Sequence, residues 1–162
     1  MLSRMNPHFE NYVSSLTPAK QLLAKEAVQE YLKGEAEEID CINSAEAAWK
    51  KTRWLADKEE EHFVVFYMKN NFRLIKSVTI AQGGLDCTIV DIRVILKNGL
   101  LCGATCLLCV HNHPSGSKNP SKEDDQLTQK VKRACEAVQI RFIDHVIVTN
   151  NDFYSYNENG RL

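Results

Sequence analysis

The chain has 162 residues, of which 44% are hydrophobic and 25% charged, and its formal net charge is -1. This length and composition are typical of one globular core and exclude a fibrous or intrinsically disordered protein. The balanced charge excludes a global positive field that would hold a phosphate backbone, so the composition gives only weak support for a nucleic-acid partner.

The start of the chain, MLSRMNPHFENYVSSL, lacks the apolar stretch of about 7 to 15 residues that a signal peptide contains. No run approaches the roughly 18 apolar residues of a membrane span, so we expect no membrane partner and a cytoplasmic location. In that compartment the six cysteines are expected to be reduced thiols and not disulfides.

Two helices are predicted in the N-terminal third. In the stretch 15–34, Thr17 before Pro18 predicts the start of an amphipathic helix, and Gly34 predicts its end. Ser44 has the side chain of an N-cap and predicts a second helix over 45–56. We expect residues 1–41 to form an N-terminal helical attachment.

From residue 61 onward, strand and helix patterns alternate. The predicted strands cover 61–68, 73–81, 105–111, 140–148 and 153–156, and the predicted helices cover 89–103 and 121–139. This order predicts an α/β fold, with a mixed sheet and flanking helices. Loops at strand ends of such sheets commonly carry functional sites, and the stretch HNHPSGSKNPSKEDD is one of them.

The first residues of this loop are candidate metal ligands. His111 and His113 are two apart on a strand, so both imidazoles point to one face, while Asn112 points to the other. Pro114 ends the strand and leaves both rings at the end of the sheet. Paired imidazoles suit zinc, but histidine pairs are more often structural, so a metal site needs a third ligand.

The third ligand stays open on periodicity alone. Ser121 and Asp124 have the spacing of a capping box, which is an alternative to metal binding. Helix periodicity turns Asp125 outward and leaves Glu123 and Asp124 on either border of the buried stripe.

The spacing HxHP, six residues and SxxD resembles the motif of JAMM (MPN-type) metalloproteases. The similarity is closest to the bacterial RadC family, whose members share HNHPSG, and it runs from about Ile42 to the end. It implies a JAB/MPN domain of cytidine-deaminase-like architecture over 42–162, with His111, His113 and Asp124 as zinc ligands. Typical members carry HPRE where this chain has DIRV at 91–94, and larger members have a helix-hairpin-helix module that is not visible here.

The resemblance also implies catalytic residues. The family has a glutamate at the head of its first long strand, two residues before a phenylalanine, and Glu61 before Phe63 fits this position. Three protein ligands would leave one zinc position for water, with Glu61 as general base. Ser121 would stabilise the oxyanion, cap the helix, or do both. The expected reaction is hydrolysis of a peptide or isopeptide bond in a protein or peptide substrate.

Other residues of the region are interpreted as structural. Cys102, Cys106 and Cys109 precede the histidines, and the two cysteines of CLLC at 106–109 could suggest a metal pair, but buried cysteine is the commoner role. A zinc deaminase would need HxE and PCxxC, which this sequence lacks. His145 and its neighbour Asp144 face opposite ways on a strand, so we place both outside the site.

A second function class is a DNA repair or recombination accessory of the RadC type. A basic patch would support it, and its candidates are Lys130, Lys132, Arg133 and Arg141. A solvated helix face is the more common explanation of such charges. The sequence determines neither the natural substrate nor the oligomeric state.

Overall fold

The computed structural model describes residues 14–24, 26, 41–83 and 90–162. The chain divides into two compact units, Met1–Ile39 and Asp40–Leu162. In the first unit residues 18–24 are helical, and the Gln21 amide donates to the Thr17 carbonyl at 2.9 Å. The helix therefore begins where Pro18 predicts it, while the end predicted at Gly34 lies outside the described residues. The boundary at residue 41 stays a prediction.

The second unit is built on a five-stranded mixed sheet of order β2-β1-β3-β4-β5. Only the β3–β4 pair is parallel among the strand pairs of the sheet. The strands are β1 (His62–Met68), β2 (Leu74–Gln82), β3 (Cys106–Asn112), β4 (Arg141–Val148) and β5 (Phe153–Ser155). The helices are α3 (Ala45–Thr52), a 3-10 turn η1 (Arg53–Leu55), α4 (Ile92–Leu101) and α5 (Lys122–Ala137). The α/β fold class and each predicted element of this unit are confirmed.

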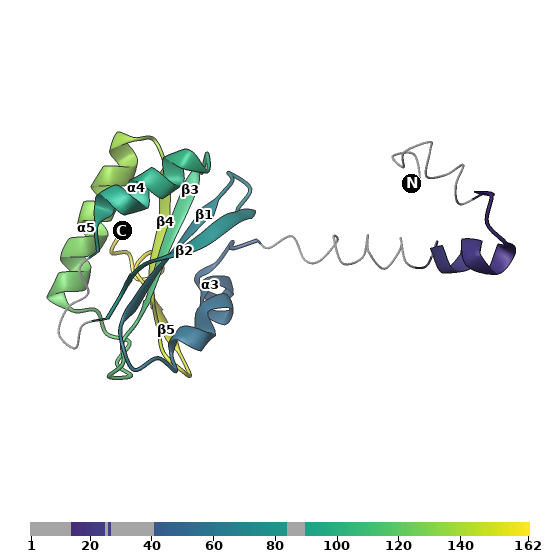
Figure 1. Cartoon of the computed structure of the whole chain (residues 1–162). Coiled ribbons are helices and arrows are strands. Elements are labelled where there is room, and N and C mark those ends of the chain that lie inside the picture. The colour runs from purple at the N-terminus through teal and green to yellow at the C-terminus, as the bar shows by residue number, and fades with distance from the viewer. Residues whose placement is uncertain (1–13, 25, 27–40, 84–89) are drawn as a thin grey trace. The chain divides into compact units, whose positions relative to one another are not determined.

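Helices cover both faces of the sheet, with α3 on one face and α4 and α5 on the other (Figure 1). All seven residues of β1 and of β3 are buried, as expected for central strands covered on both sides. Alternate residues therefore belong to different cores. Val64 and Phe66 pack in the α3 core, while Phe63 and Val65 pack in the core beneath α4 and α5.

The connection from β3 through α5 to β4 positions the candidate site. Because β3 and β4 are parallel, the chain crosses over through α5, and the helix begins near the carboxyl end of β3. The chain turns sharply after β3: the Gly116 amide donates to the His113 carbonyl at 2.9 Å, and Gly116 has a φ of 74°. A side chain at residue 116 would strain this left-handed conformation. The motif residues are thereby folded back against the sheet.

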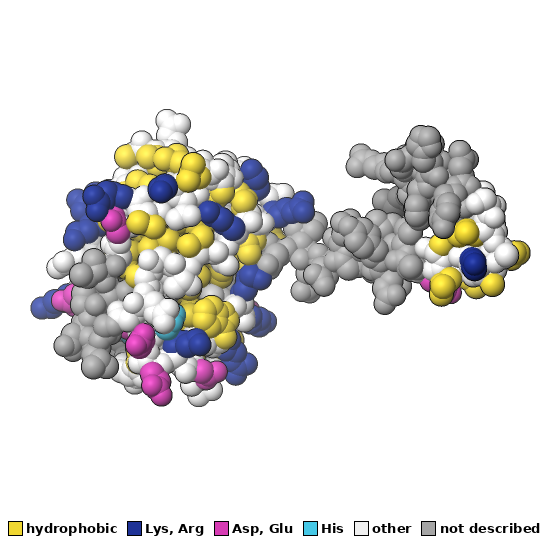
Figure 2. Space-filling model, in the orientation of Figure 1, with side chains coloured by type: hydrophobic (Ala, Val, Ile, Leu, Met, Phe, Trp, Pro, Cys, Tyr) yellow, Lys and Arg dark blue, Asp and Glu magenta, His cyan; other side chains and the backbone are white. Residues whose placement is uncertain are grey.

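Hydrophobic side chains are exposed over α4, where Figure 2 shows them gathered on the surface. They belong to Val94, Leu100 and Leu101. Across the described residues, none of the helices has both the length and the apolar character needed to span a bilayer.

A matched pair of leucines tests this layered core. Leu108 on β3 is 1% exposed, whereas Leu101 at the end of α4 is 76% exposed. We expect Leu108→Ala to lower the free energy of unfolding by about 2–5 kcal/mol, because it removes buried methyl groups and leaves a cavity. Leu101→Ala should change it by less than about 0.5 kcal/mol. Urea denaturation measures both, and equal losses would contradict the assigned layers.

Candidate metal centre

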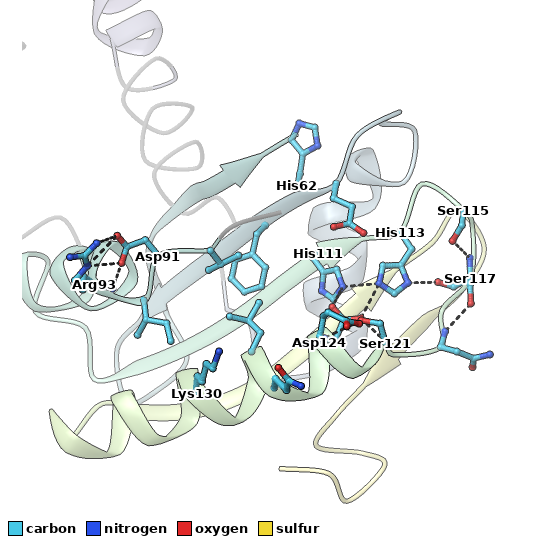
Figure 3. A pocket seen from close by; sticks show the side chains of 18 residues that line it. His62, Asp91, Arg93, His111, His113, Ser115, Ser117, Ser121, Asp124 and Lys130 are labelled. Carbon is cyan, nitrogen blue, oxygen red and sulfur yellow. Dashed lines mark hydrogen bonds and ion pairs between the residues drawn. The ribbon is translucent and has the colours of Figure 1, made fainter. Parts of the chain in front are cut away.

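Three side chains converge at the carboxyl end of β3 (Figure 3). The Nε2 atoms of His111 and His113 lie 2.9 Å apart. Asp124 Oδ1 lies 3.0 Å from His111 Nε2, and Asp124 Oδ2 lies 3.2 Å from His113 Nε2. Among the described residues, these three are the histidine, cysteine or acidic side chains that form a group of potential metal ligands, with all ligand atoms within 4.8 Å of one another. The structure thus brings the three predicted ligands together.

Asp124 occupies the third helical position of α5 and completes a capping box with Ser121. Its amide donates to Ser121 Oγ at 3.0 Å, and its Oδ2 accepts from the Ser121 amide at 2.8 Å. The Ser121 hydroxyl donates to the same Oδ2 at 2.7 Å. The two alternatives for this residue are therefore compatible, since one carboxylate caps the helix and also faces both imidazoles.

Hydrogen bonds determine which nitrogen of His113 is protonated. Its Nδ1 lies 2.7 Å from the Ser117 carbonyl oxygen, which can only accept. Nδ1 therefore carries the proton, and in the neutral ring Nε2 directs a lone pair at His111 and Asp124. The turn after β3 supplies this carbonyl, so the loop orients the ligand that it contains.

A longer chain of hydrogen bonds orients His111. Thr128 donates its hydroxyl proton to the Asp124 carbonyl at 2.6 Å. The Thr128 oxygen can therefore only accept from His145 Nδ1, which lies 2.6 Å away and carries the proton. His145 Nε2 is then an acceptor, and it lies 2.8 Å from His111 Nδ1. His111 consequently carries its proton on Nδ1 and presents the Nε2 lone pair to the cluster.

His145 was placed outside the site by the sequence, and that prediction is wrong. The register between β3 and β4 determines where the His145 side chain points. His145 lies beside Cys109, which is on the same sheet face as His111. Burial, and then the repulsion that a protonated His111 would exert, hold the pKa of His145 well below its ordinary value, so the His145 ring is neutral. Asp144 faces elsewhere and accepts from Ser155 Oγ and the Asn157 amide. No local sequence signal reports a register between two strands.

The donor set fits a divalent cation. With both Nδ1 atoms protonated, two Nε2 lone pairs face each other at 2.9 Å beside a carboxylate. That arrangement is repulsive unless a proton or a cation lies between the atoms. Two imidazoles and a carboxylate are the ligand type of open zinc sites, in which neighbouring ligand atoms about 2.0 Å from the metal lie about 3.3 Å apart. His111, His113 and Asp124 therefore fit zinc.

Without a metal, protonation of a histidine relieves the same repulsion. Burial lowers the pKa of His113, but hydrogen bonds to Asp124 and to the Ser117 carbonyl outweigh it and raise the pKa above its ordinary value. Burial raises the pKa of Asp124, but the hydrogen bonds from His111 and His113 outweigh it and hold this pKa far below its ordinary range. The carboxylate is therefore ionised at every physiological pH.

Glu61 precedes β1 and lines the same groove as the three ligands. Its charge is close enough to contribute to the raised pKa of His113. The other acidic candidates do not join the ligand atoms: Glu123 is an exposed residue of the groove wall, and Asp125 binds Arg161 and the Tyr156 hydroxyl. Helix α5 thus directs Asp124 toward the histidines and turns Asp125 away from them, which confirms what periodicity predicts for Asp125.

The groove has a volume of about 870 Å³ and extends from the ligands along α5 toward the start of α4. Part of its lining is apolar, from Phe63, Val90, Ile92 and Leu127. Figure 3 shows Asp91 and Arg93 at the end away from the histidines, where the guanidinium binds the Asp91 carboxylate at 2.7 Å. A ligand longer than one residue could therefore lie against the metal end.

The cysteines that the structure describes take no part in this cluster. Cys106 and Cys109 are buried in the two cores, and burial raises the pKa of the Cys109 thiol well above its ordinary value. Cys87 lies outside the described residues, and the remaining cysteines are free thiols. A buried neutral thiol is a poor zinc ligand, which agrees with the interpretation of these residues as core.

Comparison with known proteins identifies the family. The RadC-like JAB domain family matches residues 42–161. The chain belongs to the RadC family. A UPF0758 protein of Flavobacterium johnsoniae is 40% identical over 106 residues, which are 65% of this chain and 46% of that protein.

Two further RadC-family relatives carry the same UPF0758 name. The one from Haemophilus ducreyi is 37% identical over 137 residues, 83% of this chain and 61% of the relative. The one from Streptococcus gordonii is 39% identical over 121 residues, 75% of this chain and 54% of the relative. The chain thus spans about half the length of the curated relatives it matches.

Thr128 provides a test of how His111 is oriented. We expect Thr128→Val to reduce zinc affinity about 10- to 100-fold, because His145 loses the acceptor that fixes its tautomer. Competition with a chromophoric chelator measures the affinity. Thr52→Val is the matched control, since Thr52 is also 1% exposed and also donates to a carbonyl four residues earlier at 2.6 Å. Equal losses in the two variants would contradict the hydrogen-bond chain.

The raised pKa of His113 predicts a pH dependence of stability in the metal-free protein. Below the ordinary value of 6.5 the ring is protonated in both the folded and the unfolded state, and the stabilisation by Asp124 is complete. The free energy of unfolding should then fall as pH rises through the raised folded-state pKa. Urea titrations with a chelator, from about pH 6 to 9, measure this fall. Asp124→Asn should flatten it, and an unchanged slope in that variant would refute the pairing.

Proposed function

We propose that this RadC-family domain is a zinc-dependent hydrolase that cleaves peptide or isopeptide bonds. The observation that carries the proposal is the convergence of two imidazole lone pairs on one carboxylate, at a groove that Glu61 also lines. Membership of a JAB-domain family supports a metallohydrolase fold. The amide substrate is inferred from the resemblance to JAMM proteases.

His111, His113 and Asp124 would hold the metal. Zinc, when bound by three protein ligands, supplies a water molecule whose pKa is lowered from about 15.7 toward about 7. The protein contributes the orientation of the ligands. The Ser117 carbonyl and His145 each hold a ring with its Nε2 lone pair directed at the cluster. Little reorganisation is then needed when a cation binds.

Glu61 is the proposed general base. Its carboxylate would accept a proton from the attacking water and then deliver it to the leaving amine. A proton transfer of this kind contributes about a hundred- to ten-thousand-fold to a rate. Glu61 is outside the hydrogen-bond network of the three ligands, so its proton transfer can be removed by mutation without removing a ligand.

Ser121 is proposed to stabilise the oxyanion while it caps α5. The cap uses Ser121 Oγ as the acceptor of the Asp124 amide, which leaves the hydroxyl proton free to rotate. In this structure the proton is directed to Asp124 Oδ2 at 2.7 Å. Rotation toward a substrate carbonyl would keep the cap and supply a donor where negative charge develops.

The groove suits a peptide segment. Its apolar part would bury side chains next to the scissile bond, while the backbone of an extended substrate could reach the metal end. The DIRV segment contributes Asp91, Ile92 and Arg93 to this wall. The Arg93 guanidinium and the Asp91 carboxylate form a bidentate ion pair whose charges balance, so the wall offers shape and apolar contact more than net charge.

The alternative function, a nucleic-acid accessory, would need the basic residues of the C-terminal half to act together. Arg141 lies on β4, where its guanidinium contacts Cys106 Sγ at 3.2 Å and stacks over Phe72 at 5.3 Å. It is therefore engaged at a strand end and does not belong to the face of α5 that carries Lys130 and Arg133. This arrangement favours hydrolysis as the first candidate.

Metal binding is the first test of the proposal. We expect the purified domain to bind about one zinc per chain, because one cluster in the described part of the chain offers three ligands. At a free zinc concentration of about 100 times the dissociation constant, the free energy of unfolding should rise by about 2.7 kcal/mol. His113→Ala should lose both the zinc and the stabilisation. Metal analysis and thermal unfolding measure them, and full zinc content in His113→Ala would sink the ligand assignment.

Glu61→Gln separates chemistry from metal binding. This variant should keep its zinc and lose at least about a hundredfold in hydrolysis of any substrate that the wild-type protein cleaves. Affinity capture with Glu61→Gln, followed by mass spectrometry and nucleic-acid staining, would supply candidate substrates. Equal turnover by Glu61→Gln and the wild-type protein would refute the role of this glutamate.

A further inference from the structure

The side chain of Asn112 connects the metal ligands to the strand that carries Glu61. Asn112 is the residue between His111 and His113, and it is 0% exposed. Its Oδ1 accepts from the His62 amide at 2.8 Å, and its Nδ2 donates to the Glu60 carbonyl at 3.0 Å. One side chain therefore holds the peptide groups on both sides of Glu61.

These two hydrogen bonds extend the β1–β3 ladder beyond its last backbone pair. The register of the two strands ends at Phe63 and His111. At the next position a primary amide takes over the role of a peptide group, since it accepts from one backbone amide and donates to one carbonyl. A side chain reaches further than a backbone group, so it can hold the chain past the end of the paired strands. Glu61 lies just beyond the last backbone pair, between the two residues that Asn112 contacts.

The remaining contacts of this segment hold the backbone and leave the Glu61 carboxylate available. His62 Nδ1 donates to the Glu60 carbonyl at 2.9 Å, and the Gly83 amide donates to the Glu61 carbonyl at 3.0 Å. With Asn112, these bonds engage the carbonyl groups of Glu60 and Glu61 and the amide of His62. The backbone position of Glu61 is thereby determined relative to the strand that bears the histidines.

We propose that Asn112 is a positioning residue. It holds Glu61 close to the metal ligands His111 and His113, which flank Asn112 in the chain. This inference rests on the proposed function. It goes further in naming the group that couples the base to the metal ligands. Asn112 belongs to the opposite sheet face from the two imidazoles, and its hydrogen bonds go to the backbone amide of His62, the first residue of β1, and to the backbone carbonyl of Glu60.

A cobalt-substituted protein tests this coupling without a known substrate. The visible spectrum of bound cobalt(II) changes with pH when a proton is lost at the metal. A carboxylate nearby disfavours that loss, so Glu61→Gln should lower the pH midpoint by about one unit. Asn112→Ala should lower it in the same direction, because the carboxylate is no longer held near. Cobalt affinity should stay within about threefold of the wild-type value, because the three ligands are intact.

A double variant distinguishes an effect through Glu61 from a general loosening of the site. If Asn112 acts through Glu61, Glu61→Gln/Asn112→Ala should have the midpoint of Glu61→Gln alone. Tyr67→Phe is the control on the same strand: it removes a buried hydrogen bond to the Ile95 carbonyl at the other end of β1 and should leave the midpoint unchanged. Asn112→Ser, whose hydroxyl can make part of the contacts, should give an intermediate shift and serves if the alanine variant does not fold.

The outcomes separate this inference from the proposed function. A wild-type midpoint in a cobalt-bound Asn112→Ala or Asn112→Ser protein would overturn the role of Asn112 and leave the metal site standing. A loss of cobalt affinity as large as that of His113→Ala would overturn it too, since Asn112 would then support the ligands themselves. No cobalt binding by the wild-type protein would overturn the proposed function and this inference with it.

Discussion

The site depends on one electrostatic arrangement, in which two imidazole lone pairs and a carboxylate point at the same small volume. His111 and His113 Nε2 are 2.9 Å apart, and Asp124 lies within 3.2 Å of both. Such a group is repulsive unless a proton or a cation balances it. The β3–α5–β4 crossover makes the arrangement possible, because it brings the first turn of a helix to the end of the strand that carries the histidines.

Each ligand is held by a group from another part of the fold. The turn after β3 supplies the Ser117 carbonyl to His113, α5 supplies Thr128, and β4 supplies His145 to His111. Asp124 is held by the helix cap. Three separate elements therefore fix the same tautomer in both rings, with the proton on Nδ1 and the lone pair on Nε2. A site oriented by hydrogen bonds on rigid elements keeps its geometry better than one that depends on a loop alone.

A groove lies beside the cluster in this RadC-family domain, and its wall carries apolar side chains and a paired Asp91 and Arg93. The relatives named above are about twice as long as the part that this chain matches. Regions beyond the shared domain can add contacts or partners in those proteins. The chemistry proposed here needs only residues of the domain itself, from Glu61 to His145.

Much of this domain was predictable from local patterns: helix caps at Ser44 and Ser121, buried central strands, and two histidines on one strand face. Periodicity left Glu123 and Asp124 undecided, and motif spacing chose between them. The tertiary structure alone decided that His145 supports His111 and that Asn112 holds the backbone around Glu61. Both contacts depend on the register of strands far apart in the chain, and register is set by packing across the whole sheet, which no short sequence pattern encodes.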